Sequence, residues 1–92
     1  MVFEWDEEKR QRNLRTHGLD FADAPKVFMG AVHTFEDNRF RYDEHRFVGV
    51  GLLEDLLVVI AFTEPQHDVI RVISMRKATK NEERKYFRKI AH

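Results

Sequence analysis

The residues best suited to chemistry are Arg76 and the basic residues that follow it. In the segment 69–76, VIRVISMR, an apolar and β-branched run ends at Arg76, and a helix-forming segment begins soon afterwards. An arginine side chain and the free N–H groups of a first helical turn then point at the same region, which favours binding of an anion such as phosphate. Lys77 and Lys80 add positive charge there. The alternative is a solvated strand end without a ligand, and these features alone favour that alternative.

A second group of polar residues lies near the N-terminus. Lys9, Asn13 and His17 recur every four residues in a helix-forming segment, so they share one helix face. Lys9 can neutralise a phosphate, and the imidazole of His17 can transfer a proton near neutral pH. An exposed helix face with an ordinary C-terminal cap explains the same residues. From the residues alone, that simpler explanation is favoured.

Glu82 has a structural explanation that competes with a catalytic one. Thr79 and Glu82 have the spacing of a capping box, in which the two side chains bind each other's backbone N–H groups. The chain also contains five histidines, but their spacing matches no metal motif, and there is no glycine-rich phosphate loop or nucleophile elbow. The sequence therefore predicts no metal and no cofactor.

Composition and charge narrow the class of protein. The 92 residues predict a single domain (1–92), and the absence of cysteine excludes disulfides and thiolate chemistry. The net charge is zero, but residues 71–92 carry a net charge of +6 and residues 1–70 carry −6. This balance argues against bulk affinity for nucleic acid and leaves room for a local anion site or an acidic partner. No apolar run is long enough for a membrane span and no signal peptide is evident, so a cytoplasmic protein is expected.

The N-terminal third predicts two helices, and the C-terminal end predicts a third. The first spans 6–18, where acids precede bases and Gly18 follows the last turn. The second spans about 21–29, but Pro25 fits poorly beyond a first turn, so the helix begins near Ala24 or opens with a distorted turn. The third runs from Thr79 to about Ile90.

Between these helices the apolar period changes to two. Strands are expected at 31–37, 46–53, 56–63 and 69–76, with a tight turn at 54–55 and an exposed loop at 38–45. Residues 3–6 form a short strand-like entry. The predicted fold is α+β, with two N-terminal helices, a four-stranded antiparallel meander and a C-terminal helix.

Strict alternation along 69–76 predicts how the last strand faces the rest of the molecule. It places Arg76 on one face with Ile70, Val72 and Ser74. It places Arg71 on the other face with Val69, Ile73 and Met75.

Three stretches of the chain together resemble the BrnT family of bacterial type II toxins. They are FEWDEEKRQRNLRTHGLDF (3–21), DEHRFVGVG (43–51), and VVIAFTE followed by IRVISMRKATKNEERKYF (58–64 and 70–87). The matching positions are Phe3, Trp5, Asp6, Lys9, Asn13, His17, Gly18, Phe21, Arg46, Gly51, Arg71, Ser74, Arg76, Ala78, Thr79, Glu82 and Tyr86. The resemblance covers nearly the whole chain, and the ordered set of motifs is quite specific.

This resemblance implies a RelE-like fold and a metal-independent endoribonuclease that inhibits translation by cleaving RNA. It also implies an antitoxin partner of the BrnA type with a ribbon-helix-helix domain, and it leaves room for a homodimer within the toxin–antitoxin complex. In such toxins the ribose 2′-OH is thought to attack the adjacent phosphate, a reaction that needs a base, an acid and cations.

On the same resemblance, each candidate residue receives an expected role. Arg76 would hold the transition-state phosphate, His17 would be the acid or base, and Lys9 would be a second cation. Glu82 would act as a base only if Thr79 does not hold it. The expected RNA-binding residues are Arg46, Arg71, Lys77 and Lys80.

A competing function class is a non-catalytic binding module. In that case the basic C-terminal region would hold an antitoxin or another acidic partner, and no reaction would take place.

Overall fold

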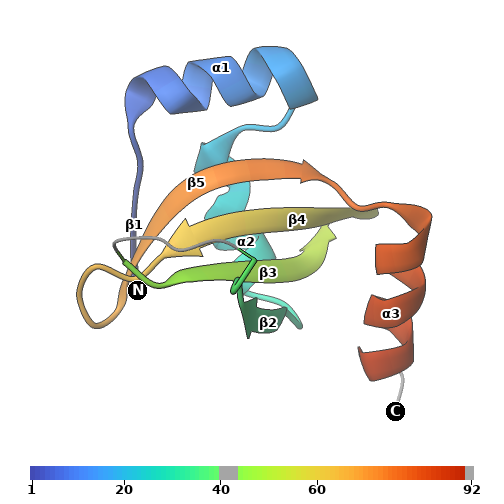
Figure 1. Cartoon of the computed structure of the whole chain (residues 1–92). Coiled ribbons are helices and arrows are strands. Elements are labelled where there is room, and N and C mark those ends of the chain that lie inside the picture. Colours follow the sequence, from blue (N-terminus) through green and yellow to red (C-terminus); the bar gives the residue numbers. More distant parts are fainter. Residues whose placement is uncertain (40–43, 91–92) are drawn as a thin grey trace.

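The computed structural model describes residues 1–39 and 44–90 (Figure 1). Its five strands form one sheet in the order β1-β5-β4-β3-β2, accompanied by three α-helices and one 3₁₀ turn. The elements are β1 (Val2–Glu4), α1 (Glu7–His17), the 3₁₀ turn η1 (Phe21–Asp23), α2 (Ala24–Phe28), β2 (His33–Glu36), β3 (Arg46–Leu53), β4 (Leu56–Thr63), β5 (Val69–Lys77) and α3 (Lys80–Ile90). The α+β class is confirmed.

The sheet differs from the predicted four-stranded antiparallel meander. Strands β2 to β5 do form that meander, but β1 adds a fifth strand and runs parallel to β5, with Val2 opposite Val69. The prediction missed this pairing because β1 has only three residues, too few to show a strand period, and its partner lies near the other end of the chain. Residues 40–43 of the predicted 38–45 loop lie outside the described residues.

The first helix follows its sequence signals closely. Asp6 is its N-cap, and its carboxylate accepts a hydrogen bond of 3.1 Å from the N–H of Lys9. Gly18 ends the helix at φ 70°, a left-handed conformation that glycine adopts without steric penalty. The second predicted helix is divided into η1 and the short α2, because Pro25 fits only in a first helical turn. The α-helix thus begins at Ala24 and is preceded by a distorted turn, so both predicted alternatives are present.

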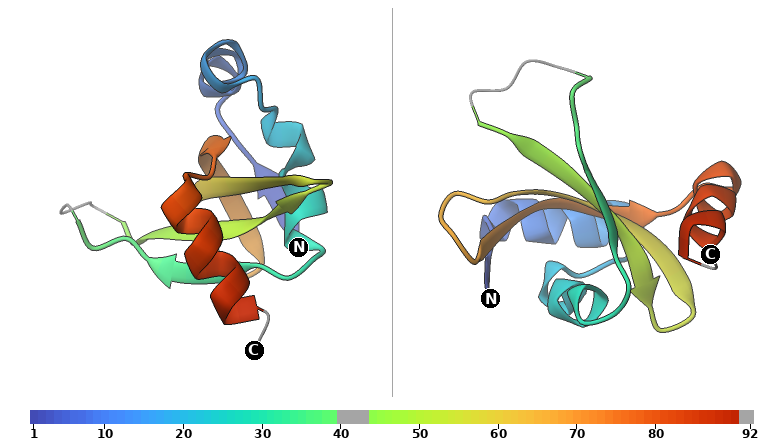
Figure 2. Two further views of the ribbon diagram at one scale, coloured as in Figure 1. Left: turned by 90° about the vertical axis from the view of Figure 1, so that its right-hand side faces the viewer. Right: turned by 90° about the horizontal axis from the view of Figure 1, so that it is seen from below.

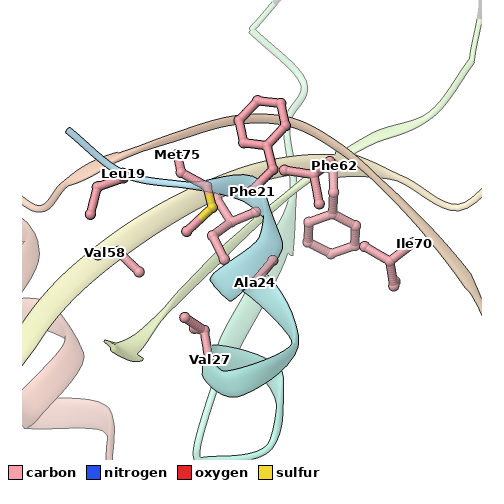
Figure 3. Packing of buried hydrophobic residues seen from close by; sticks show 10 residues of the cluster. Leu19, Phe21, Ala24, Val27, Val58, Phe62, Ile70 and Met75 are labelled. Carbon is pink, nitrogen blue, oxygen red and sulfur yellow. The ribbon is translucent and has the colours of Figure 1, made fainter. Parts of the chain in front are cut away.

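Helices cover the two faces of the sheet unequally. Figure 2 shows α2 on one face and α3 on the other, at one end of the sheet. The main core lies under η1 and α2 (Figure 3), where it consists of Leu19, Phe21, Ala24, Val27, Val58, Ile60, Phe62, Ile70, Val72 and Met75. A smaller cluster under α3 contains Tyr86, whose hydroxyl donates a hydrogen bond of 2.7 Å to the carbonyl oxygen of Ala31.

Glycine in β3 allows α2 to approach the sheet closely. A Cβ atom added to Gly51 would lie 2.9 Å from Cγ1 of Val27 and 3.2 Å from Cγ2 of Val32. That separation is shorter than real carbon contacts allow, so the glycine is needed for this packing.

An irregularity in β5 changes which residues face the core. Ser74 pairs with Ala61 of β4, while Val72 pairs with the next residue, Phe62, so Ile73 is an extra residue, as in a β-bulge. Alternation restarts after it, and Met75 rather than Ser74 lies in the core. The predicted faces are therefore wrong across the bulge, because Ile70 and Val72 lie on one face and Ser74 and Arg76 on the other.

The correction matters for the arginines of β5. Because the register changes once between them, Arg71 lies on the same face as Ser74 and Arg76, and this is the face that α3 only partly covers.

In the part of the chain that the structure describes, no helix is long and apolar enough to cross a membrane.

Candidate functional site

The open part of the sheet face beside α3 contains a hollow of about 260 Å³, here called the sheet hollow. Its floor is formed by small and apolar residues of β3, β4 and β5, including Ser74. Charged groups surround it: Arg76 and Glu82 on one side, and Glu36, Asp37 and Arg39 on the other. The strand-to-helix junction predicted from the sequence is thus part of a concave surface.

Arg76 is held in a defined orientation at this hollow. Its Nη1 and Nη2 atoms each donate a hydrogen bond of 2.8 Å to the carboxylate of Glu82, and Nη1 also lies 3.3 Å from the carbonyl oxygen of Lys77. The side chain is still 41% exposed, so a ligand in the hollow can reach it. The hydrogen bonds to Glu82 raise the pKa of Arg76, so the guanidinium remains charged.

Glu82 is also bound by the start of α3. The N–H of Thr79 donates 2.8 Å to its carboxylate, and its own N–H donates 3.2 Å to Oγ1 of Thr79, which confirms the capping box. Hydrogen bonds from Arg76, followed by the one from Thr79, lower the pKa of Glu82 to about 2. The condition under which Glu82 would act as a base is therefore not met in this structure, where it orients Arg76.

The opposite wall of the sheet hollow was not predicted as part of a site. Arg39 donates hydrogen bonds of 2.9 and 3.1 Å to the carboxylate of Asp37, and this pairing lowers the pKa of Asp37. These residues continue from β2 into the following loop. The only signal in the sequence was that Asp37 continues the alternation of Phe35, which also lines the hollow.

Two further predicted phosphate ligands share this sheet face. Arg46 and Arg71 lie on either side of Thr63 in one row across β3, β4 and β5. Arg71 is paired with Glu4, with Nε 2.6 Å from Oε2. Arg71 and Arg76 are five positions apart in β5, about 15 Å, and Arg71 is turned to Glu4 while Arg76 is turned to Glu82, so the two do not meet at one phosphate in this arrangement.

The predicted lysines at the junction do not line the sheet hollow. Lys77 pairs with Val58 and points to the opposite face of the sheet, since it follows Arg76 directly in the strand. Lys80 is exposed in the first turn of α3.

The residues predicted on the first helix gather in another depression. Lys9, Arg12, Thr16, His17 and Ile73 line a hollow of about 290 Å³, together with Asn13; it is here called the α1 hollow. The structure thus brings Lys9 and His17 together, as predicted. It does not place them with Arg76, because no residue in the described part of the chain lines both hollows.

Asn13 joins this helix to the sheet. It is 7% exposed, and its amide nitrogen donates hydrogen bonds of 3.0 Å to the carbonyl oxygens of Leu19 and Met75. Its carbonyl oxygen accepts one of 3.1 Å from the N–H of Met75. The side chain therefore forms hydrogen bonds with the backbone on the outer edge of β5, beyond the end of its pairing with β1. The last pair of β1 with β5 is Glu4 with Arg71. Its role in the predicted polar stripe is structural.

Potential metal ligands are dispersed. Within residues 1–39 and 44–90, no three histidine, aspartate or glutamate side chains are grouped so that they could hold a metal ion.

Most of the chain matches a known protein family. The family model described as "Ribonuclease toxin, BrnT, of type II toxin-antitoxin system" matches residues 5–82. The chain belongs to the BrnT family. The match includes α1 with its hollow and ends at Glu82, so it contains the whole Arg76–Glu82 pair. Because the BrnT family consists of type II toxins, an antitoxin partner is implied.

A solved structure supports the same assignment. The crystal structure of the Brucella abortus ribonuclease toxin BrnT is similar with a TM-score of 0.69 and 31% sequence identity, over 87% of this chain and 100% of that one. No curated protein matches the chain.

Proposed function

We propose that this BrnT-family chain is an endoribonuclease toxin that cleaves RNA without a metal ion and thereby inhibits translation. The observation that carries the proposal is Arg76, a permanently charged and partly exposed guanidinium held by Glu82 at the edge of a concave sheet face. Membership of a ribonuclease toxin family supplies the reaction class.

RNA provides the nucleophile of this reaction. The ribose 2′-oxygen attacks the adjacent phosphorus, the bond to the 5′-oxygen breaks, and a 2′,3′-cyclic phosphate and a 5′-hydroxyl are formed. Negative charge develops on the phosphate oxygens in the transition state, where a fixed cation stabilises it most. Arg76 is placed in that role. Arg46 and Arg71 would bind flanking phosphates on the same face.

The proton transfers are assigned to His17, since the low pKa of Glu82 makes its carboxylate a poor base. For this, bound RNA must place its reacting ribose beside His17, the last residue of α1. The expected result for His17→Ala is a fall in the single-turnover cleavage rate of about 10²- to 10⁴-fold. An unchanged rate would remove His17 from the mechanism.

The function is tested by inducing the wild-type chain, Arg76→Ala and Arg84→Ala in bacteria, with growth and total RNA integrity followed in each. Arg84 is an exposed residue of α3 that lines neither hollow, so it is the matched control. Growth arrest with RNA loss in the wild type and Arg84→Ala alone is expected. Cleavage by purified protein should persist in EDTA. Harmless expression of a folded wild-type chain would contradict the proposal.

A groove between β2 and α3 favours a second candidate function, the non-catalytic binding module. It measures about 260 Å³, has an apolar floor, and carries a basic rim on α3. Its lining residues include Val50, Tyr86, Lys85, Arg88 and Lys89. Such a surface suits an acidic protein segment with apolar side chains.

We infer that an antitoxin of the BrnA type, with a ribbon-helix-helix domain, is the partner, in a complex that can contain two toxin copies. Co-expression with a BrnA-type antitoxin, followed by co-purification and light scattering, tests this. A tight complex formed by a chain that never cleaves RNA would favour the binding module.

A further inference from the structure

The α1 hollow carries positive charge that is not balanced locally. Lys9, Arg12 and His17 contribute to its lining and no carboxylate of the described residues does, although the chain has as many acidic as basic residues. Thr16 adds a hydroxyl group that can donate a hydrogen bond. Two cations and a hydroxyl around a depression without acids form a surface suited to a phosphate group.

The direction in which this hollow opens follows from the geometry of α1. Asn13 points at the edge of β5, and Arg10 lies about 60° to one side of it around the helix. Arg10 donates hydrogen bonds of 2.7 and 2.9 Å to Asp20, which precedes η1, so that flank faces the α2 side of the sheet. Lys9, Arg12 and Thr16 lie on the other flank, about 40°, 100° and 60° from Asn13. His17, the last residue of α1, lies about 40° from Asn13 on the Arg10 side.

The cationic flank of α1 therefore opens on the side of the sheet that holds Arg76. The left view of Figure 2 shows α1 end-on beside β5, with α2 and α3 on opposite sides of the sheet. The two hollows meet at consecutive residues of one strand, because Ile73 lines the α1 hollow and Ser74 lines the sheet hollow. The two hollows therefore lie on either side of β5 at this point.

We propose that the α1 hollow is a second RNA subsite, in which Lys9, Arg12 and Thr16 bind a backbone phosphate next to the one at Arg76. The RNA strand crosses the edge of β5 at Ile73 and Ser74. The inference rests on the proposed ribonuclease function and changes the role of Lys9, which binds a flanking phosphate and not the reacting one.

Asn13 gives this subsite a rigid base. Its hydrogen bonds to the backbone of Met75 fix α1 to β5 one residue before Arg76. The spacing between the two phosphate sites is therefore set by the fold, so a single strand with two adjacent phosphates at that spacing is the expected ligand. A double-stranded RNA is stiff, so it would have to bend across the edge of β5 to reach both phosphate sites.

The test measures binding of a short fluorescent single-stranded 2′-O-methyl RNA, which has no free 2′-OH and is not cleaved. The variants are Arg12→Ala and Lys9→Ala. The matched control is Arg15→Ala, which removes an exposed arginine of α1 that does not line the hollow. Circular dichroism verifies that each variant is folded.

Each of the two variants should weaken binding roughly three- to tenfold and reduce the slope of log K against log salt by about 0.7 to 1. Arg15→Ala should bind like the wild type. With cleavable RNA, Arg12→Ala should raise KM in proportion and keep the single-turnover rate at saturating RNA.

Other results have distinct meanings. Equal affinities in Arg12→Ala, Lys9→Ala and Arg15→Ala overturn the subsite, as does a wild-type chain that does not bind the probe. A lower saturating rate with unchanged affinity makes Lys9 catalytic and also overturns it. Loss of antitoxin capture without loss of RNA binding assigns the hollow to a protein contact. If the binding pattern holds while the wild type cleaves no RNA, the subsite stands and the ribonuclease function fails.

Discussion

Arg76 and Glu82 are joined by two hydrogen bonds of 2.8 Å, so the first turn of α3 orients the guanidinium group at the sheet hollow. Glu82 is in turn held by the N–H of Thr79. A structural motif that caps a helix thus also positions the proposed phosphate ligand. The two explanations that the sequence offered for Glu82, a helix cap and a part of the site, are combined in one side chain.

Arg76→Lys separates charge from geometry. Lysine keeps the positive charge but cannot form two parallel hydrogen bonds with a carboxylate. We expect the single-turnover cleavage rate to fall about tenfold or more, less than the 10²- to 10³-fold that is typical when a transition-state donor is lost. Arg84→Lys, on the exposed side of α3, should cleave normally. A fully active Arg76→Lys would mean that orientation by Glu82 is irrelevant.

Glu82→Gln should change the acid stability of the protein. The folded-state pKa of Glu82 is about 2, below its ordinary value of 4.5, so ionised Glu82 stabilises the fold fully above pH 4.5. That contribution is lost as the pH falls toward 2. The difference in thermal midpoint between wild type and Glu82→Gln should therefore be largest near neutral pH and shrink below pH 4.5. Glu83 makes no ion pair in the described part of the chain, so Glu83→Gln should show no such trend.

Asn13→Ala should destabilise the protein without touching the sheet hollow. It leaves the N–H and carbonyl oxygen of Met75 and the carbonyl oxygen of Leu19 without their partner. Buried groups left unpaired in this way cost about 1–3 kcal/mol each, reduced where water can enter. We expect a loss of about 2–4 kcal/mol in urea unfolding. Asn81→Ala on exposed α3 is the control, and an equal effect there would contradict the edge role of Asn13.

Gly51→Ala and Gly30→Ala form a matched pair for close packing. The added methyl group at Gly51 meets Cγ1 of Val27 at 2.9 Å, whereas at Gly30 the nearest atom is the carbonyl oxygen of Val27 at 3.8 Å. Overpacking should cost about 1–3 kcal/mol at Gly51. At Gly30 the change should be close to neutral. Thermal unfolding of both variants measures the difference, and equal midpoints would show that α2 can shift away from β3.

Local signals predicted the helices and the meander well. Gly18 and the Thr79–Glu82 pair are caps whose chemistry acts within one helical turn, so they can be seen in the sequence. The N-cap Asp6 was not predicted. The two-residue turn between β3 and β4 also lies where it was predicted. Pro25 correctly marked the division of the second helix, where both predicted alternatives are found.

The missed features depend on contacts that are distant in the chain. The bulge at Ile73 follows from how β5 meets β4, and no residue type at 72–74 marks it. The error separated Arg71 from Arg76, and it separated Met75 from Ile70 and Val72, with which it shares the core. The convergence of Asp37 and Arg39 with Arg76 required the order of the strands, which alternation alone does not supply.

The pairing of β1 with β5 also has a consequence for the order in which the molecule assembles. Hydrogen bonds join residues 62 and 67 positions apart, at Asn13 with Met75 and at Glu4 with Arg71, whereas the hairpins from β2 to β5 close over short loops. Long closures lose more chain entropy, so we expect the meander to form early and the N-terminal segment to dock last. Docking of that segment is the step that brings Lys9 and Arg12 beside β5. In pulsed hydrogen exchange, the amide of Ile60 should therefore become protected before that of Met75. The RNA-binding surface formed by the α1 hollow and the sheet hollow would exist only after this final step.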